Sequence, residues 1–169
     1  MELHLVDCKK LKPEVFQVFG ERNALLTAGD RNHCNTMTIG WCQLGRLWNL
    51  PVCTVYVRPE RYTFSFMEEQ DTSSVSILPA GQQRVMAYCG SKSGQDVDKF
   101  KECSLSVRYG AGETPVIEQA ELVLVCKKLF VQDMNPSCVK DERVNRCYTP
   151  EQGGWHRAYV GEVLEAYTR

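Results

Sequence analysis

The sequence lacks long apolar runs and an excess of charge of either sign. No apolar stretch approaches the ~20 residues that a membrane-spanning helix requires. The net charge is −1, whereas proteins that coat nucleic acid usually carry a strong basic excess. Charged residues such as Glu2, Asp7 and Lys9 stand where a secretory signal would be apolar. We therefore expect no membrane span and no nucleic-acid partner, and the pattern favours a cytoplasmic protein.

Several nucleotide and metal motifs are also missing. There is no Gly-x-Gly-x-x-Gly fingerprint of a dinucleotide-binding fold and no Walker phosphate loop. Nine cysteines are present, but no two are separated by only two residues, as zinc ligands usually are. An odd number of cysteines without a signal peptide also argues against a disulfide framework. This usage favours buried, reduced thiols and predicts no metal site.

What is present is an ordinary globular composition, with 43% hydrophobic and 24% charged residues. A chain of 169 residues fits one domain with a real core. No repeat or low-complexity linker interrupts it, so a single domain is expected over residues 1–169.

Strand patterns predominate along the chain. They cover residues 14–19, 24–28, 35–44, 52–57, 73–78, 120–131 and 155–167. Shorter helices are expected at residues 62–69, 82–88 and 96–103. Residues 135–153 are polar and predict a surface excursion, and Gly161 predicts a bulge in the last strand. This order favours a mainly β protein, an antiparallel barrel with helices attached, over a doubly wound α/β sheet.

A basic segment follows the clearest strand, residues 52–57. Arg58, Pro59, Arg61 and Thr63 come directly after it. Pro59 suits the first position of a helix, because its φ is fixed and no N–H is needed there. Free N–H groups at the helix start, two guanidinium groups and a hydroxyl would together attract a phosphate. A solvated basic turn is the alternative interpretation.

A second segment places polar residues on an apolar strand. Asn35, Thr36 and Thr38 flank Met37, and Trp41 follows. Buried hydroxyl and amide groups need hydrogen-bond partners, which a flat heteroaromatic ligand would supply. The alternative is a half-exposed strand with its polar face in water.

A third segment is a loop of alternating small and polar residues. It runs Gly90, Ser91, Lys92, Ser93, Gly94. Glycines allow backbone N–H groups to approach an anion closely, and hydroxyls beside a lysine would help to hold it. The alternative is a flexible polar loop before a helix.

Through these segments, the chain resembles the flavin reductase-like, FMN-binding split-barrel proteins, in particular the flavoredoxin branch. The matching pieces occur in the family's order and span most of the chain. They are residues 35–41, residues 55–59 with Arg61, Tyr62 and Thr63, residues 88–94 with Asp96, Asp98, Lys99 and Phe100, and His156 with Tyr159, Gly161 and Glu162.

The resemblance implies a six-stranded antiparallel split barrel of Greek-key topology with a few short helices. It also implies a homodimer that holds FMN non-covalently near the subunit interface. The cofactor-binding residues carried over by position are Asn35, Thr36, Met37, Thr38 and Trp41 for the ring, Arg58, Arg61, Thr63 and Lys99 for the phosphate and ribityl chain, Ser91, Lys92 and Ser93 in support, and Tyr159 on the last strand.

His156 is the proton donor that the resemblance offers for catalysis, with a histidine satisfied on a strand as the alternative. The chain departs from the family as we picture it by having Cys42 and Cys53 on pocket-side strands. A role for their thiols stays open.

The resemblance implies electron transfer through the flavin. An NAD(P)H-dependent flavin reductase would take hydride from NADH or NADPH and pass electrons to free flavin or to a redox protein. A flavoredoxin-type carrier would exchange electrons between redox proteins without oxidising NAD(P)H. A third interpretation, from a different functional class, is a barrel that binds a ligand without catalysis.

Overall fold

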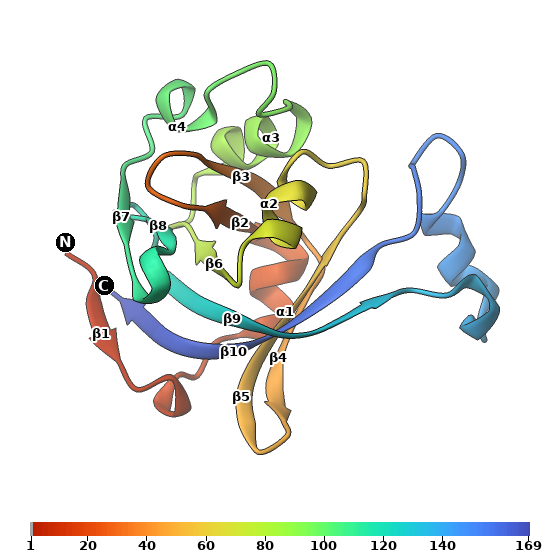
Figure 1. Cartoon of the computed structure of the whole chain (residues 1–169), viewed down its shortest axis with the longest axis horizontal. Helices are drawn as coiled ribbons and strands as arrows, with labels where there is room; N and C mark the ends of the chain where they lie inside the picture. The colour runs from red at the N-terminus through yellow and green to blue at the C-terminus, as the bar shows by residue number, and fades with distance from the viewer. Residues whose placement is uncertain (1) are drawn as a thin grey trace.

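The structure, a computed structural model that describes residues 2–169, is a strongly curved antiparallel sheet with short helices packed at one end (Figure 1). Seven strands follow one another in the order β3-β2-β6-β9-β10-β5-β4, and β1 pairs with β10. These strands are β1 (His4–Val6), β2 (Ala24–Gly29), β3 (Cys34–Ile39), β4 (Cys42–Leu47), β5 (Leu50–Val57), β6 (Thr72–Ile77), β9 (Leu122–Asp133) and β10 (Arg157–Thr168). A separate hairpin pairs β7 (Val107–Tyr109) with β8 (Pro115–Ile117).

The helices are short. They are α1 (Val15–Gln17), α2 (Thr63–Glu69), α3 (Gln83–Ser91) and α4 (Lys99–Glu102). Single 3₁₀ or π turns are η1 (Cys8–Lys10), η2 (Val18–Arg22), η3 (Ala111–Glu113), η4 (Pro136–Cys138) and η5 (Glu142–Cys147). α2 packs on β2 and β3, whereas α3 and α4 pack on β3. Figure 1 shows these three helices gathered around that end of the sheet.

The mainly β, antiparallel fold class predicted from the sequence is confirmed. The large sheet has eight strands rather than six, and it is not closed, because β3 and β4 each pair on one side only. Within residues 2–169, no helix combines the length and apolarity needed to cross a membrane.

β9 and β10 have two parts. The first five residues of β9 are buried, and most of the remainder is exposed. The outer parts of the two strands form a ribbon that leads to the polar residues 134–156, which project to one side in Figure 1. The predicted bulge at Gly161 is confirmed by a register shift between Val160 and Gly161. A Cβ at Gly161 would lie 2.9 Å from the Cβ of Cys126, so the close strand approach requires glycine.

One predicted strand is wrong. Residues 14–19 form α1 and the start of η2 instead. Val18 and Phe19 are buried and Val15 packs against them, whereas Phe16 is almost fully exposed. Val15, Val18 and Phe19 stand at positions i, i+3 and i+4, which is the spacing of residues on one face of a helix. This spacing outweighs the apparent alternation of apolar and polar residues that suggested a strand.

Two further expectations need correction. Residues 35–44 form two strands, because the chain turns at Gly40 and Trp41 and carries β3 and β4 to opposite edges of the sheet. Pro59 does not start a helix, since α2 begins at Thr63. Pro59 instead occupies the second position of a turn in which Arg61 N donates to the Arg58 carbonyl at 3.0 Å, and its fixed φ suits that position as well.

The other elements are found close to the predicted bounds. β2, β5, β6, α2, α3, β9 and β10 match, while α4 is shorter than expected and starts only after Asp98. Asp98 caps α4 by accepting a hydrogen bond from Lys101 N at 3.1 Å. The polar excursion is also confirmed, with only short 3₁₀ turns in it.

Candidate functional site

Asn35 is the point at which three of the polar segments meet. Its side chain is 4% exposed, and Nδ2 donates to Thr63 Oγ1 at 2.9 Å. A Cβ on Gly94 would lie 2.1 Å from Asn35 Oδ1, so only glycine permits the loop after α3 to lie against this amide. The structure therefore brings β3, the start of α2 and the 90–94 loop into direct contact.

Lys99 joins α4 to both β3 and α3. Although it is charged, it is only 4% exposed, and its Nζ donates to the carbonyl oxygens of Thr36 and Cys89, both at 2.9 Å. Burial lowers the pKa of Lys99, and the nearby positive charge of Arg61 acts in the same direction. An ammonium group has three N–H donors, so one remains for a further acceptor.

The side chains of Thr36, Met37 and Thr38 on β3 are also engaged inside the protein. Thr36 Oγ1 contacts Thr27 Oγ1 at 3.0 Å and the Leu26 carbonyl at 3.2 Å. Thr38 Oγ1 donates to the Met86 carbonyl at 2.6 Å, and Met37 is buried in the main core. β3 is an edge strand, so what it offers a ligand is its outer backbone rather than these side chains.

The two arginines of the basic segment point in different directions. Arg61 Nη1 donates to the Gly90 carbonyl at 3.1 Å, which places its guanidinium at the C-terminal end of α3. Arg58 instead reaches the excursion, where it donates to the carbonyl oxygens of Cys147, at 2.9 Å, and of Gln152. Only Arg61 therefore joins the junction around Asn35 and Lys99.

The residues after α3 lie beside Arg61. Lys92 is exposed, and Ser93 Oγ accepts a hydrogen bond from Gln95 N at 3.2 Å. Ser91 is the last residue of α3, and its Oγ donates back to the Ala87 carbonyl at 2.8 Å. Ser91 is thus occupied within its own helix, while Lys92 remains accessible.

His156 belongs to an aromatic cluster at the base of the excursion. Its Nδ1 lies 3.1 Å from the Tyr148 hydroxyl, and its ring lies 4.6 Å from that of the half-exposed Trp41. Burial lowers the pKa of His156 to about 4, and the positive charges of Arg58 and Arg61 act in the same direction. This shift favours the uncharged imidazole at neutral pH, and the role of His156 as a proton donor stays a prediction.

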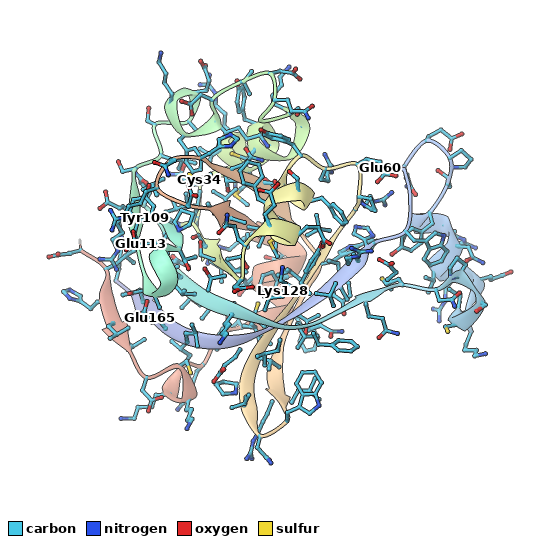
Figure 2. All side chains as sticks on the ribbon, viewed as in Figure 1. Cys34, Glu60, Tyr109, Glu113, Lys128 and Glu165 are labelled. Carbon is cyan, nitrogen blue, oxygen red and sulfur yellow. The ribbon has the colours of Figure 1, made fainter. Side chains whose placement is uncertain are left out.

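Tyr148 and Trp155 complete this cluster, and neither was among the residues predicted from the sequence. Their rings stack at 3.8 Å between centroids, with 11° between the planes. Glu60 joins the excursion to the basic segment by accepting a hydrogen bond from Gly154 N at 2.8 Å, and Figure 2 labels it beside that loop. The sequence signal that could have indicated these two residues is the presence of aromatic side chains in a stretch that is otherwise polar and contains glycines.

Tyr159 does not reach His156. The two residues are three positions apart in an extended segment, so their side chains point to opposite faces. Tyr159 is 2% exposed, and its hydroxyl donates to Glu68 Oε1 at 2.6 Å. Burial and the Glu68 carboxylate raise the pKa of Tyr159. Tyr159 thus fixes α2 to the barrel rather than lining the aromatic cluster.

The family can now be named from the sequence. A model described as the flavin reductase like domain matches residues 16–169. The chain belongs to this family. The family predicted from the motifs is therefore confirmed. No curated protein matches the chain.

Solved structures show the same fold as this flavin reductase-like chain. Flavoredoxin from Methanosarcina acetivorans has 25% identity and a TM-score of 0.67, covering 97% of this chain and 76% of that one. An FMN-binding protein from Thermus thermophilus with bound 1-cyclohex-2-enone has 22% identity and a TM-score of 0.68, covering 86% and 69%. NADH:FAD oxidoreductase SgcE6 from Streptomyces globisporus has 20% identity and a TM-score of 0.64, covering 96% and 85%.

Arg61 and Lys99 form a positive region without an acidic partner. Among residues 2–169, neither of them forms an ion pair with a carboxylate, whereas Arg22, Arg31, Arg143 and Arg157 do. A buried cation is normally paired, because desolvating it is costly. Lys99 with Arg61 beside it is thus suited to an anionic ligand.

Two hollows of the protein differ in their relation to the predicted site residues. A groove of 740 Å³ runs between the N-terminal segment and the β4–β5 hairpin, away from every predicted site residue. A cavity of 440 Å³ touches the aromatic cluster through Trp41 and Tyr148. No group of three or more metal-ligating side chains occurs within residues 2–169.

Proposed function

We propose that this protein binds FMN non-covalently and transfers electrons through it, as an NAD(P)H-dependent flavin reductase-like oxidoreductase. The observation that carries the proposal is the buried Lys99, which lies beside Arg61 with no carboxylate partner, at the open edge of β3. Membership of the flavin reductase-like family supports it, as does the FMN-binding protein among the structural neighbours.

The residues present fit a phosphorylated flavin. The third Nζ donor of Lys99, the Arg61 guanidinium and the exposed Lys92 are donors and charges suited to a phosphate monoester, with Ser93 as a neighbouring hydroxyl. The outer backbone of β3, from Asn35 to Thr38, is proposed to pair with polar atoms of the isoalloxazine ring. Thr63 would act indirectly, since its hydroxyl orients the Asn35 amide.

When bound, the flavin supplies the exchange of hydride and electrons, while the protein supplies position and electrostatics. Arg61 and Lys99 are proposed to fix the phosphate end, so that the ring is held in one orientation. Trp41 and the uncharged His156 are proposed to cover the ring and restrict water, with Tyr148 holding the imidazole in place.

A flavoredoxin-type electron carrier is the second candidate. The flavoredoxin from Methanosarcina acetivorans, at 25% identity over most of this chain, favours it. Such a carrier would exchange electrons with redox proteins and would need no nicotinamide site.

We also propose a homodimer with the flavin near the interface. Exposed apolar side chains support this proposal. Trp48 on the β4–β5 hairpin lies with its ring 6.0 Å from that of Phe130 on β9, and both are more than 40% exposed. Leu47 and Leu129, their neighbours in the sequence, are exposed as well. Large exposed apolar side chains that gather on one surface commonly mark a contact with another chain.

Stopped-flow reduction tests the two electron-transfer functions. The FMN-loaded protein is mixed anaerobically with NADH or NADPH, and flavin absorbance is followed. Bleaching on a catalytic timescale supports the reductase. If neither nicotinamide bleaches the flavin but a reduced ferredoxin-type protein does so rapidly, the carrier is correct and the reductase proposal is rejected.

A further inference from the structure

Cys89 and Cys103 lie side by side at the edge of the proposed flavin site. Their Sγ atoms are 4.0 Å apart. Cys89 is buried near the end of α3, whereas Cys103 is partly exposed directly after α4. The dithiol therefore joins a partly exposed residue to a buried one, with the two sulfurs in contact.

The chain between these two thiols, residues 90–102, includes the loop that the proposed function uses. It contains Lys92, Ser93 and the buried Lys99, which is the first residue of α4. Lys99 Nζ donates to the Cys89 carbonyl at 2.9 Å, and Cys103 N donates to the Lys99 carbonyl at 3.0 Å. Any movement of Cys103 relative to Cys89 is thus passed directly to Lys99.

Cys42 and Cys53 form a second close pair and provide a comparison. Their Sγ atoms are 3.4 Å apart, closer than those of Cys89 and Cys103. They face each other diagonally across β4 and β5, because Cys42 pairs with Val55 and Cys53 pairs with Leu44. Diagonal neighbours in a sheet have Cα atoms roughly 7–8 Å apart, and disulfides rarely bridge more than about 7 Å.

The backbone at Cys103 has more freedom to adjust. Cys103 is the C-terminal cap of the single-turn α4, and Ser104 after it has a positive φ of 52° in an irregular segment. A disulfide requires the sulfurs to approach to about 2.05 Å. A short helical turn followed by a loop moves more readily than two hydrogen-bonded strands.

We propose that Cys89 and Cys103 are a redox modification site that closes reversibly to a disulfide by exchange with a small-molecule disulfide such as oxidised glutathione. The Cys103 thiolate attacks one sulfur of the reagent, the reagent's S–S bond breaks, and the released thiolate takes up a proton. Cys89 then loses its proton to solvent and attacks the Cys103 sulfur, which expels the second glutathione thiol. The two protein thiols lose two electrons, and the reagent gains them.

The order of attack follows from the structure. Cys103 is the more exposed of the two residues, so we expect it to meet the reagent first. Burial raises the pKa of the Cys89 thiol to about 12, while the Lys99 charge acts in the opposite direction. Cys89 therefore acts as the second nucleophile, in an intramolecular step. Only a small fraction of Cys89 is thiolate, but its contact with Cys103 compensates for this small fraction.

Closure also regulates the proposed flavin site, a consequence that rests on the proposed function. Drawing Cys103 toward Cys89 displaces α4, and Lys99 with it, from the Thr36 carbonyl. We expect the oxidised protein to bind FMN at least threefold more weakly than the reduced protein.

Peptide mapping tests the modification itself. The protein is equilibrated with reduced and oxidised glutathione in varied ratio, free thiols are alkylated, and the chain is cut with trypsin. We expect residues 85–92 linked to residues 102–108, and dithiothreitol should reverse the link. Cys103→Ser should abolish it, while the exposed Cys138→Ser should leave it intact.

Two results would overturn the proposal. One is recovery of Cys89 and Cys103 only as alkylated thiols or glutathione adducts at every ratio. The other is a link between residues 32–46 and 47–61 in its place, with fragmentation of the linked peptides showing Cys42 rather than Cys34 as the partner of Cys53, which would assign the redox site to Cys42 and Cys53. FMN titration of the same samples separates the two proposals. Equal affinity of both forms rejects the regulation, whereas failure of the reduced form to bind FMN rejects the proposed function and leaves the mapped disulfide standing.

Discussion

Lys99 Nζ donates to the Thr36 carbonyl oxygen at 2.9 Å, which fastens α4 to the open edge of β3. A buried lysine that bonds only to carbonyl oxygens keeps its charge uncompensated, and this is why we place the phosphate there. The contact also gives Lys99 a structural role that its position in the sequence does not reveal.

Replacing Lys99 with methionine keeps the apolar stem and removes the charge. We expect Lys99→Met to weaken FMN binding by roughly 1.5–3 kcal/mol, the range for a charged hydrogen bond, which is about 10- to 150-fold in Kd. Titration of the apo-protein with FMN measures this. The exposed Lys101→Met on the same helix is the matched control and should bind normally. An affinity of Lys99→Met equal to that of the wild type refutes the phosphate assignment.

Arg58 and Arg61 are expected to behave differently, although the sequence assigned both to the phosphate. Arg61→Ala should weaken FMN binding, because its guanidinium lies at the loop after α3. Arg58→Ala should chiefly loosen the excursion, since Arg58 holds two of its carbonyl oxygens. Limited trypsin digestion would then cut faster at Arg143 and Arg146. Equal digestion rates in the two variants would show that Arg58 does not anchor the excursion.

Gly94→Ala should disrupt the Asn35 junction. The added methyl would lie 2.1 Å from Asn35 Oδ1, so the loop or the amide must move. Overpacking of this kind costs about 1–3 kcal/mol of unfolding free energy, and the displaced loop should also lower FMN affinity. Gly45→Ala is the control, since its new Cβ meets no atom within 4 Å. Urea unfolding compares the two, and equal stability would contradict the packing described here.

His156 should make the free energy of unfolding depend on pH. Its pKa of about 4 lies below the ordinary value of 6.5, so the unfolded chain takes up this proton first as the pH falls. The folded state therefore loses stability between pH 6.5 and pH 4, by on the order of 1–3 kcal/mol, and the loss is constant at lower pH. His156→Gln should lack this component. Unfolding free energies of both proteins at pH 7.5, 5.5 and 4 measure the difference, and parallel curves would show that His156 is not held uncharged.

Several residues that the sequence motifs grouped together do meet in the fold, while their role in binding FMN stays a prediction. Asn35, Arg61, Lys99 and the 90–94 loop come together as the motifs indicated, because each motif is tied to a strand end or helix end that the fold fixes. The proposed single domain over residues 1–169 stays a prediction.

The roles of other side chains depend on tertiary contacts that local sequence patterns do not reveal. Thr36 and Thr38 satisfy their hydroxyls within the protein, and only the position of β2 and α3 shows this. Tyr159 turns to Glu68 because strand alternation separates it from His156. Tyr148 was missed because its partner His156 is reached only once the excursion folds back on β10.

Titration of the purified apo-protein with FMN, followed by absorbance and flavin fluorescence, decides whether this protein is an FMN-binding flavoprotein. We expect a yellow complex with a Kd of about 1 μM or lower, equivalent to about −8 kcal/mol, and a large loss of affinity in Lys99→Met. Absence of binding at FMN concentrations of about 100 μM, roughly a hundred times the expected Kd, would contradict the account.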